Sequence, residues 1–289
     1  MISVIISSGN NELLSRVKLN IAQTIGVPFE IISTANGNGD MGICSVYNES
    51  VFKAKYEILC FMHEDLEIKT VGWGLKVVET FVKDNRLGVL GVAGCAYKTY
   101  VPSGWDVIGN EGSYRYINYI QSYRQAKRDS QSIVHNPTQT DLAKVACVDG
   151  MWFCASKDTA IKFPFDELLL KGFHGYDIDF CLNVGQYLDI KVTFEVLMEH
   201  FSEGNFSHQW VGEILKVHSK WRNILPLNVG FGNREELDTF EKRACKNLIK
   251  NMIKFNFDRK MILSELFDAQ RARKVSMFNF IKLLIRTVC

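Results

Sequence analysis

A regular alternation of short apolar runs with stretches of helical periodicity constrains the fold of this chain more than any other feature. Residues 2–7 and 57–62 are apolar runs that end in polar or turn-forming residues, which is typical of buried strands. Between them, Val17 and Ile21 belong to an apolar series at helical spacing, which Asn10 or Asn11 can cap. The elements expected on this pattern are strands at 2–7, 30–34, 57–62 and 87–93 and helices at 13–25, 44–55 and 73–82. This alternation predicts an α/β fold with a parallel sheet.

The pattern changes twice along the rest of the chain. Residues 94–141 are rich in aromatic side chains but lack a regular period, and a long irregular insertion in a compact domain is more often functional than structural. Regular elements then resume, with strands expected at 145–155 and 190–194, a helix at 177–187, and a short segment at 197–199 that leads to His200. Beyond residue 226, apolar residues at helical spacing predict two or three amphipathic helices. We therefore expect a domain over 1–225 and a helical region over 226–289.

Composition excludes several classes of protein. Hydrophobic residues make up 47% and charged residues 23% of the 289 residues, as in ordinary globular chains. With 34 basic and 32 acidic residues, the net charge of +2 argues against a general nucleic-acid binder. The eight cysteines form no CxxC pair, which favours buried thiols in a reducing compartment. The sequence shows no signal peptide and no apolar run of the ~18 residues that a spanning helix needs, so we expect a cytoplasmic protein.

Polar clusters follow several of the expected strands. They lie at residues 7–10, 36–40, 63–65 and 149–150, and two more follow at 175–179, where a helix begins, and at His200. In an open α/β sheet, ligands bind beyond the carboxyl ends of the strands. These clusters are therefore the candidates for a functional site.

His63 and Asp65 are two residues apart at a strand end, so both side chains can point the same way. An imidazole with a carboxylate suits a divalent ion such as Mn²⁺ or Mg²⁺ with phosphate oxygens completing the shell, and His200 is the natural third ligand. The alternative is a solvated turn with three polar residues. Asp177 and Asp179 are similarly ambiguous, because acidic residues stabilise the first turn of a helix, whereas one of them beside an alcohol could act as a general base.

Taken in order, these segments resemble the GT-A fold glycosyltransferases of the family-2 type over about residues 1–205. The resemblance rests on Ser3-Val4-Ile5-Ile6-Ser7-Ser8, Glu30-Ile31-Ile32-Ser33-Thr34-Ala35-Asn36, Asn48, Phe61-Met62-His63-Glu64-Asp65, Val148-Asp149-Gly150-Met151-Trp152-Phe153, Phe165-Asp166-Glu167 and Gly175-Tyr176-Asp177-Ile178-Asp179. His63 stands where the family has the first Asp of its DxD motif, and Tyr176 replaces the usual acidic residue before Asp177. The resemblance implies a Rossmann-like, mostly parallel central sheet flanked by helices, with a C-terminal helical extension that the family does not account for.

The resemblance further implies transfer of a sugar from a nucleoside-diphosphate donor to an acceptor hydroxyl, with inversion and with Mn²⁺ or Mg²⁺, in bacterial-type glycan or polysaccharide synthesis. The acceptor would be a saccharide or a lipid-linked saccharide. By position in the family motifs, the expected metal ligands are His63, Asp65 and His200, and Asp177 is the expected catalytic base. The expected donor-nucleotide residues are Ser7, Ser8, Asn10, Asn36, Asn48 and Glu64. The acceptor side is expected to include Asp149, Gly150, Trp152 and Asp179.

Other functions fit parts of the sequence. Gly37-Asn38-Gly39-Asp40-Met41-Gly42 matches GxGxxG, which would indicate an NAD(P)-binding oxidoreductase, although turn residues separate it from the strand. The two histidines with Asp65 also match the facial triad of iron oxygenases, whose sites usually sit on an all-β fold. A third alternative is a sugar-nucleotide-binding protein of the same fold without turnover.

The C-terminal helices have two interpretations. Their apolar faces can pack on the preceding domain. Alternatively, the helix at 275–288, with Lys274, Lys282 and Arg286 among its polar residues, rests on an anionic membrane surface.

Overall fold

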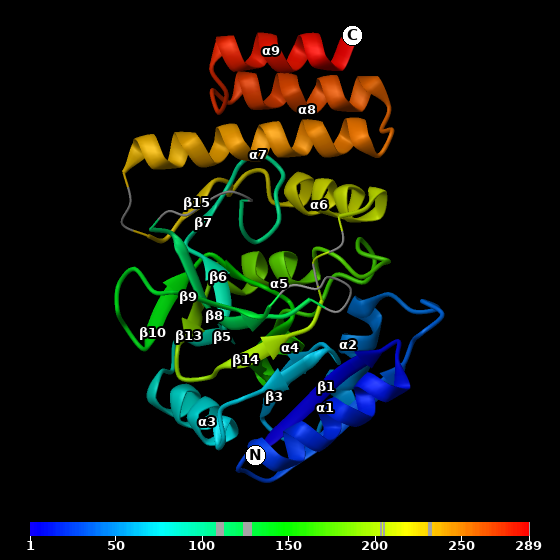
Figure 1. Cartoon of the computed structure of the whole chain (residues 1–289), viewed down its shortest axis with the longest axis vertical. Coiled ribbons are helices and arrows are strands. Elements are labelled where there is room, and N and C mark those ends of the chain that lie inside the picture. Colours follow the sequence, from blue (N-terminus) through cyan, green and yellow to red (C-terminus); the bar gives the residue numbers. More distant parts are fainter. Residues whose placement is uncertain (108–112, 124–128, 203, 205, 231–232, 289) are drawn as a thin grey trace.

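The computed structural model describes residues 1–107, 113–123, 129–202, 204, 206–230 and 233–288. An α/β body carries the N-terminus (Figure 1). At the opposite end of the molecule, α7 (Arg234–Lys254), α8 (Arg259–Arg271) and α9 (Met277–Val288) lie in successive layers. Between the body and these layers lies α6 (His208–Lys220), which the sequence pattern did not predict.

The central sheet has seven strands, five of which run in one direction. Their order is β10 (Leu142–Val145), β13 (Asp189–Thr193), β5 (Leu87–Gly91), β12 (Trp152–Ser156), β3 (Ile58–Met62), β1 (Ile2–Ser8) and β2 (Phe29–Ala35). The parallel pairs are β1 with β2, β1 with β3, and β13 with β5, whereas β12 and β10 run against their neighbours. The expected mostly parallel sheet is confirmed.

Helices cover both faces of this sheet. Val4 and Ile6 of β1 pack with α1 (Asn11–Thr24) and α3 (Trp73–Lys83), whereas Ile5 faces the side of α2 (Ile43–Lys53) and α5 (Tyr176–Val184). Strands buried on both faces read as continuous apolar runs, which is why they could be recognised in the sequence. The seven cysteines within the described residues are buried and free, as expected.

A second sheet lies at the carboxyl ends of the parallel strands of the central sheet. Its strands are β11 (Cys147–Val148), β6 (Ala93–Cys95), β8 (Arg115–Gln121), β14 (Met198–His200) and β4 (Leu66–Ile68), with β9 (Gln131–His135) paired to β8. A small third sheet pairs β15 (Leu227–Asn228) with β7 (Tyr97–Lys98). The expectation that 94–141 is irregular was therefore wrong. Alternation in β8 is obscured because Asn118 points inward and donates to the carbonyls of Phe194 and Val196, at 3.1 and 2.8 Å.

The expectation of one continuous strand at 145–155 was also wrong, because two strands, β11 and β12, lie there. The chain leaves β11 after Val148, turns through Asp149, Gly150 and Met151, and enters β12 at Trp152. The short helix α4 (Lys157–Lys162) follows β12. Val148, Met151 and Trp152 are buried on either side of this break, so hydrophobicity alone did not reveal it.

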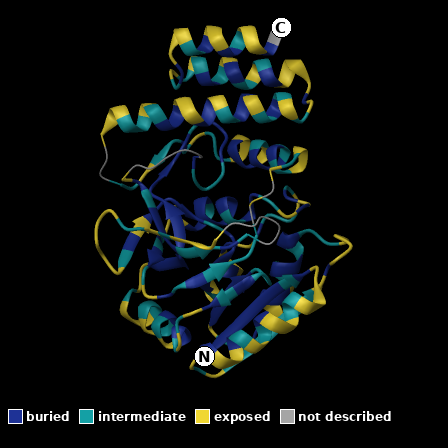
Figure 2. Ribbon diagram, viewed as in Figure 1, coloured by how far each residue is buried: buried dark blue, intermediate teal, exposed yellow. Residues whose placement is uncertain are grey.

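The C-terminal helices pack on one another and on α6. Phe240, Ala244, Leu248 and Met252 are buried in α7, which confirms the expected apolar face. The outermost helix, α9, buries part of its apolar surface against α8 and α7 but leaves another part exposed (Figure 2). Within the described residues, no helix combines the length and the apolar character needed to span a membrane.

Candidate functional site

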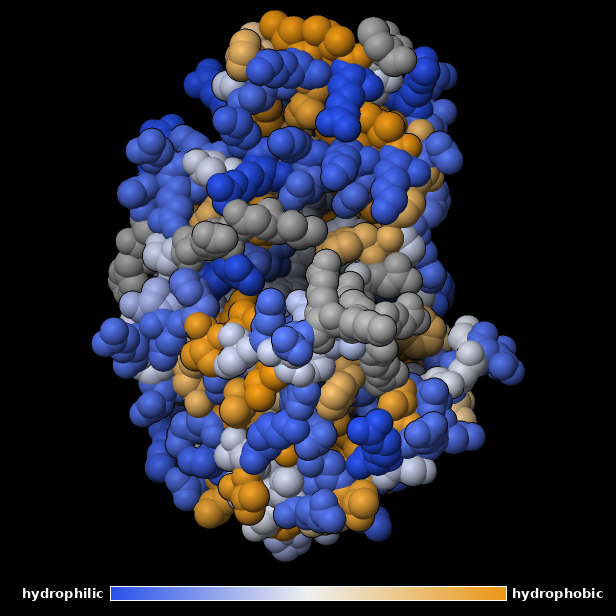
Figure 3. Space-filling view, in the orientation of Figure 1, coloured by the Kyte–Doolittle hydropathy of each residue, from blue (hydrophilic) through white to orange (hydrophobic). Residues whose placement is uncertain are grey.

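A cavity of about 880 Å³ opens at the carboxyl ends of β1 and β3, bounded on the far side by α6 and α7. The surface is hollowed between the C-terminal helices and the α/β body (Figure 3). The cavity brings together nine of the expected site residues: Ser7, Asn10, His63, Glu64, Asp65, Asp149, Gly150, Asp177 and His200. Ser8, Asn36, Asn48, Trp152 and Asp179 do not line it.

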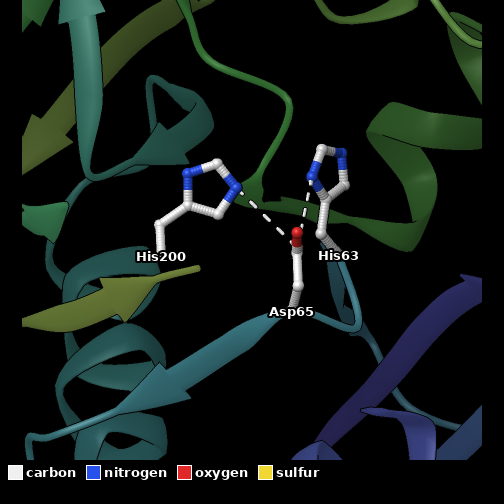
Figure 4. A group of neighbouring side chains, drawn as sticks. All are labelled: His63, Asp65 and His200. Atoms are coloured by element: carbon white, nitrogen blue, oxygen red, sulfur yellow. Dashed lines mark ion pairs between the residues drawn. The ribbon is translucent and has the colours of Figure 1, made fainter. Parts of the chain in front are cut away.

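Strand pairing explains how His200 reaches the two residues that follow β3. In the second sheet, His200 of β14 stands opposite Leu66 of β4, directly after Asp65. His200 Nε2 lies 3.7 Å and His63 Nδ1 3.9 Å from the same oxygen, Asp65 Oδ1 (Figure 4). One ligand atom from each residue lies within 4.8 Å of the others. The three side chains therefore lie close together in space, as the sequence analysis predicts.

Tyr176 fixes the orientation of the His63 ring. The Tyr176 hydroxyl donates to the carbonyl of Gly150 at 3.0 Å and lies 3.1 Å from His63 Nε2. Since a carbonyl oxygen can only accept and a phenol has one proton, this arrangement makes the hydroxyl accept from His63 Nε2–H. In the neutral ring, the lone pair of Nδ1 then points toward the Asp65 carboxylate. Two facing acceptors suit a cation between them, so the residues fit a divalent metal ion, and Tyr176 is the outer partner that orients a ligand.

Asp177 lies at the first turn of α5 with its carboxylate held by two backbone donors. Gly150 N–H donates to Oδ2 and Ile178 N–H donates to Oδ1, each at 2.9 Å. Burial, together with the neighbouring charge of Asp149, raises the pKa of Asp177 to about 7. A carboxyl group with this pKa, held in a cavity, is suited to accept a proton near neutral pH.

Gly150 allows this arrangement because a side chain has no room there. A Cβ at this position would lie 2.3 Å from the Tyr176 hydroxyl oxygen and 3.2 Å from Asp177 Cβ. The turn between β11 and β12 therefore places its backbone directly against both functional side chains.

Glu64 organises the edge of the cavity nearest β1. Its carboxylate accepts from the Ser8 hydroxyl, from Gly9 N–H at 3.1 Å and from Asn10 N–H at 3.2 Å. The Asn10 side chain in turn caps α1, as expected, by accepting from Glu12 and Leu13 N–H. Ser8 thus stabilises this turn from outside the cavity, whereas Ser7, Asn10 and Glu64 line it.

The other expected residues outside the cavity hold loops or fill the core. Asn36 closes its own loop by hydrogen bonds of 2.8 and 3.1 Å to the backbone of Met41. Asn48 exchanges two hydrogen bonds with the backbone of Phe165. Trp152 is fully buried against Trp73, with ring centroids 5.9 Å apart. These positions give Asn36, Asn48 and Trp152 structural roles in place of the expected contacts with ligands.

Asp179 is an internal ion-pair partner. It is 2% exposed, pairs with Lys220 at 2.8 Å and accepts from Trp221 Nε1 at 2.7 Å. Lys220 also pairs with Asp166 at 2.8 Å. Asp179 therefore ties α5 to the end of α6, and its expected place on the acceptor side is corrected.

The glycines of the GxGxxG match serve loop packing. A Cβ at Gly42 would lie 2.6 Å from the carbonyl oxygen of Lys171, and one at Gly37 would lie 3.1 Å from that of Gly9. Gly39 has a φ of +69°. This loop lies against neighbouring protein backbone, which does not favour the oxidoreductase alternative.

Sequence reasoning missed part of the cavity wall. Trp210 of α6 and Asn247 and Asn251 of α7 line the cavity. Trp105, from the aromatic segment that the sequence analysis expects to be functional, lines it as well. The available signal was the spacing of Asn247 and Asn251, four residues apart beside the apolar stripe of α7, which places both amides on one side of the helix.

Comparisons with known proteins agree with this architecture. A family model described as "Glycosyltransferase like family" matches residues 3–220. No curated protein matches the chain in sequence. Among solved structures, GalNAc-T7 with UDP, GalNAc and Mn²⁺ is similar at 13% identity and a TM-score of 0.52, with 89% of this chain and 57% of that chain covered. This chain therefore spans little more than half the length of that protein.

Two further solved structures are similar at lower TM-scores. TarS of S. aureus is 12% identical, with 87% of this chain and 43% of that chain covered and a TM-score of 0.48. A197 from STIV is 13% identical, with 70% and 86% covered and a TM-score of 0.40.

Proposed function

The chain belongs to the glycosyltransferase-like family, and we propose that it transfers a sugar from a nucleoside diphosphate to an acceptor hydroxyl with inversion and with the aid of a divalent ion. As a member of this family it is a nucleotide-sugar glycosyltransferase of GT-A fold. The observation that carries the proposal is the convergence of His63, Asp65, His200 and Asp177 on one cavity.

Charge in the cavity supports the need for a cation. Among the described residues that line it, none is Lys or Arg, whereas Glu64, Asp65, Asp106, Asp149 and Asp177 are acidic. A diphosphate would meet these carboxylates without a basic side chain to offset its charge. A divalent ion held by His63, Asp65 and His200 would supply that compensation as negative charge develops on the leaving diphosphate. The similar GalNAc-T7 structure carries Mn²⁺, which we take as the first ion to test here.

Asp177 is the proposed general base. Its carboxylate is held by the backbone N–H groups of Gly150 and Ile178, so its position does not depend on a flexible side-chain partner. The acceptor hydroxyl would give its proton to Asp177 while its oxygen attacks the anomeric carbon from the side opposite the diphosphate. This single displacement inverts the configuration of that carbon.

The donor and acceptor would occupy opposite parts of the cavity. We assign the nucleotide to the edge formed by Ser7, Asn10 and Glu64, at the carboxyl ends of β1 and β3. Asp149 and Gly150 lie on the side of Asp177, where the acceptor hydroxyl has to reach its base. The setting that fits these substrates is glycan or polysaccharide synthesis.

We further propose that α9 makes peripheral contact with an anionic membrane, near which lipid-linked saccharide acceptors would be available. Phe278, Ile281 and Ile285 are 66%, 48% and 57% exposed, and Lys282 and Arg286 are exposed beside them. Apolar side chains gather on the outer surface of this helix at the top of the molecule (Figure 3). An apolar stripe bordered by cations is typical of helices that bind the surface of a membrane.

A thermal-shift panel tests the proposed reaction class. The full chain is heated with each common nucleoside diphosphate, with and without Mn²⁺. One base with Mn²⁺ should raise the unfolding midpoint well above the rest, because only a ligand that binds the folded state stabilises it by mass action. The Asp65→Asn variant should lose the part of the shift that depends on Mn²⁺. If no nucleotide shifts the midpoint under any condition, the proposed function is contradicted.

A further inference from the structure

We propose that α6 and α7 form a subsite for a neutral saccharide, the part of the acceptor that extends away from the reacting hydroxyl. This inference rests on the proposed function, since it names the acceptor of the same cavity. It concerns a wall that lies partly outside residues 3–220, over which the family model matches.

One face of α7 is open to the cavity. Ala244, Asn247, Leu248 and Asn251 all line it and recur at helical spacing. Lys246 and Lys250, on the same turns, are exposed and do not line the cavity. Asn247 and Asn251 therefore line the cavity with their amide side chains, whereas Lys246 and Lys250 face solvent.

Aromatic rings line the same cavity as these amides. Phe206 and Trp210 line the cavity with ring centroids 4.7 Å apart and an interplanar angle of 81°. Trp105 approaches from the segment 102–107, where a Cβ at Gly104 would lie 3.4 Å from the Trp210 ring. That segment therefore packs within van der Waals reach of Trp210 on α6.

The aromatic and helical parts of the wall are held together. Glu241, one turn before Ala244, accepts from the Tyr97 hydroxyl at 2.7 Å, from Tyr100 N–H at 2.8 Å and from Val101 N–H at 3.1 Å. The segment that carries Trp105 is therefore anchored to α7. A wall fixed in this way presents its rings and amides in a set geometry, which lowers the entropic cost of binding.

The chemistry of the wall selects a neutral polyhydroxylated ligand. Amides offer both donors and acceptors, as sugar hydroxyls do, and aromatic rings pack against the apolar faces of sugars. A phosphate or an acidic sugar would meet no Lys or Arg among the described residues that line the cavity. The nearby Asp106 is acidic and pairs with Arg115 at 2.8 Å.

The experiment is a glycan array that carries neutral, carboxylated and phosphorylated oligosaccharides, probed with the full labelled chain in Mn²⁺. We expect binding to neutral glycans. The Asn247→Ala/Asn251→Ala double variant and the Trp210→Ala variant should each weaken that binding at least tenfold. The matched control, Lys246→Ala/Lys250→Ala on the outer face of the same helix, should bind as the original chain does.

Further measurements separate the possible failures. Asn247→Asp/Asn251→Asp keeps the shape of the side chains while removing their N–H donors, so it should also lose glycan binding with an unchanged unfolding midpoint. Binding to charged glycans only, binding to none, or binding unaffected by every inner-face variant would overturn the subsite. If the subsite fails in this way but nucleotide still raises the unfolding midpoint, the proposed function is retained. If nucleotide no longer raises the midpoint, both the subsite and the proposed function are rejected.

Discussion

Tyr176 and His63 are the two positions at which the chain departs from the family motifs named above, and a 3.1 Å contact joins them. The Tyr176 hydroxyl donates its hydrogen bond to the carbonyl of Gly150, so the neutral His63 ring donates from Nε2 and has its Nδ1 lone pair toward Asp65. A histidine in place of an aspartate removes a negative charge from the site and supplies nitrogen, which suits Mn²⁺ and later transition metals better than Mg²⁺. The two departures are therefore coupled in structure, a link that separate motifs could not reveal.

Replacing Tyr176 by Phe removes the hydroxyl that orients His63. We expect Mn²⁺ affinity, measured by titration calorimetry, to fall about 10- to 100-fold, as is usual for outer partners of metal ligands. Tyr187→Phe, at an exposed position, is the control and should leave the affinity unchanged. Equal affinities for the Tyr176→Phe variant and the original chain would rule out this positioning role.

Asp177→Asn tests the proposed base. Transfer should fall by roughly 10² to 10⁴, the usual contribution of a positioned base, while nucleotide affinity stays within a few-fold. In the original chain, kcat/KM should rise with pH up to about 7 and then level off, because burial and Asp149 raise the pKa of Asp177 to about 7 and only the ionised form accepts a proton. A variant with full activity would exclude Asp177 as the base.

The same raised pKa makes a prediction for stability. A carboxyl whose pKa is higher in the folded than in the unfolded state favours folding while protonated, and that contribution is lost as pH rises from about 4 through 7. The difference in unfolding midpoint, Asp177→Asn minus the original chain, should therefore be larger at pH 8 than at pH 4. A pH-independent difference between the two proteins would contradict the raised pKa.

At the scale of elements, local periodicity was sufficient for most elements that bury a regular stripe, but not for α6, whose buried Val211, Ile214 and Val217 recur at helical spacing. The cap at Asn10, the helices of the body and the buried face of α7 follow directly from such stripes. The direction of a strand within the sheet could not be predicted from periodicity. For example, β12 runs antiparallel to β3 and β5 because it pairs with residues far away in the chain. The turn at 149–151 and the strands within 94–141 were not predicted for the same reason, since their burial depends on pairing in the second sheet.

The proposed membrane contact depends on one element, α9. Replacing Phe278, Ile281 and Ile285 by Ser changes side chains that are 66%, 48% and 57% exposed, so the fold should persist. In liposome flotation with vesicles that contain anionic lipid, the original chain should float and the triple variant should remain at the bottom. Salt should weaken flotation of the original chain because Lys282 and Arg286 contribute electrostatically. The same flotation of both proteins would contradict the role proposed for α9.

At the scale of the molecule, the site exists only because separate layers meet. The body supplies His63, Asp65 and Asp177, the second sheet supplies His200, and α6 and α7 complete the cavity wall. The expected convergence of Asp65, Asp177 and His200 is confirmed as geometry, whereas Asn36, expected in the same cavity, turns to its own loop. Asp65 follows β3, Asp177 lies in the first turn of α5 and His200 ends β14. Their meeting was predicted from the order of these motifs along the chain, whereas the contribution of the C-terminal helices depends on how whole layers pack.

The most direct measurement is a crystal structure of the full chain with Mn²⁺ and the nucleoside diphosphate that stabilises it most, with anomalous scattering recorded at the manganese edge. The account predicts one anomalous peak bound by His63, Asp65 and His200, with diphosphate oxygens on the same ion and Asp177 facing the open side. A nucleotide bound elsewhere, or a diphosphate held in this cavity without an ion on these three residues, would contradict it.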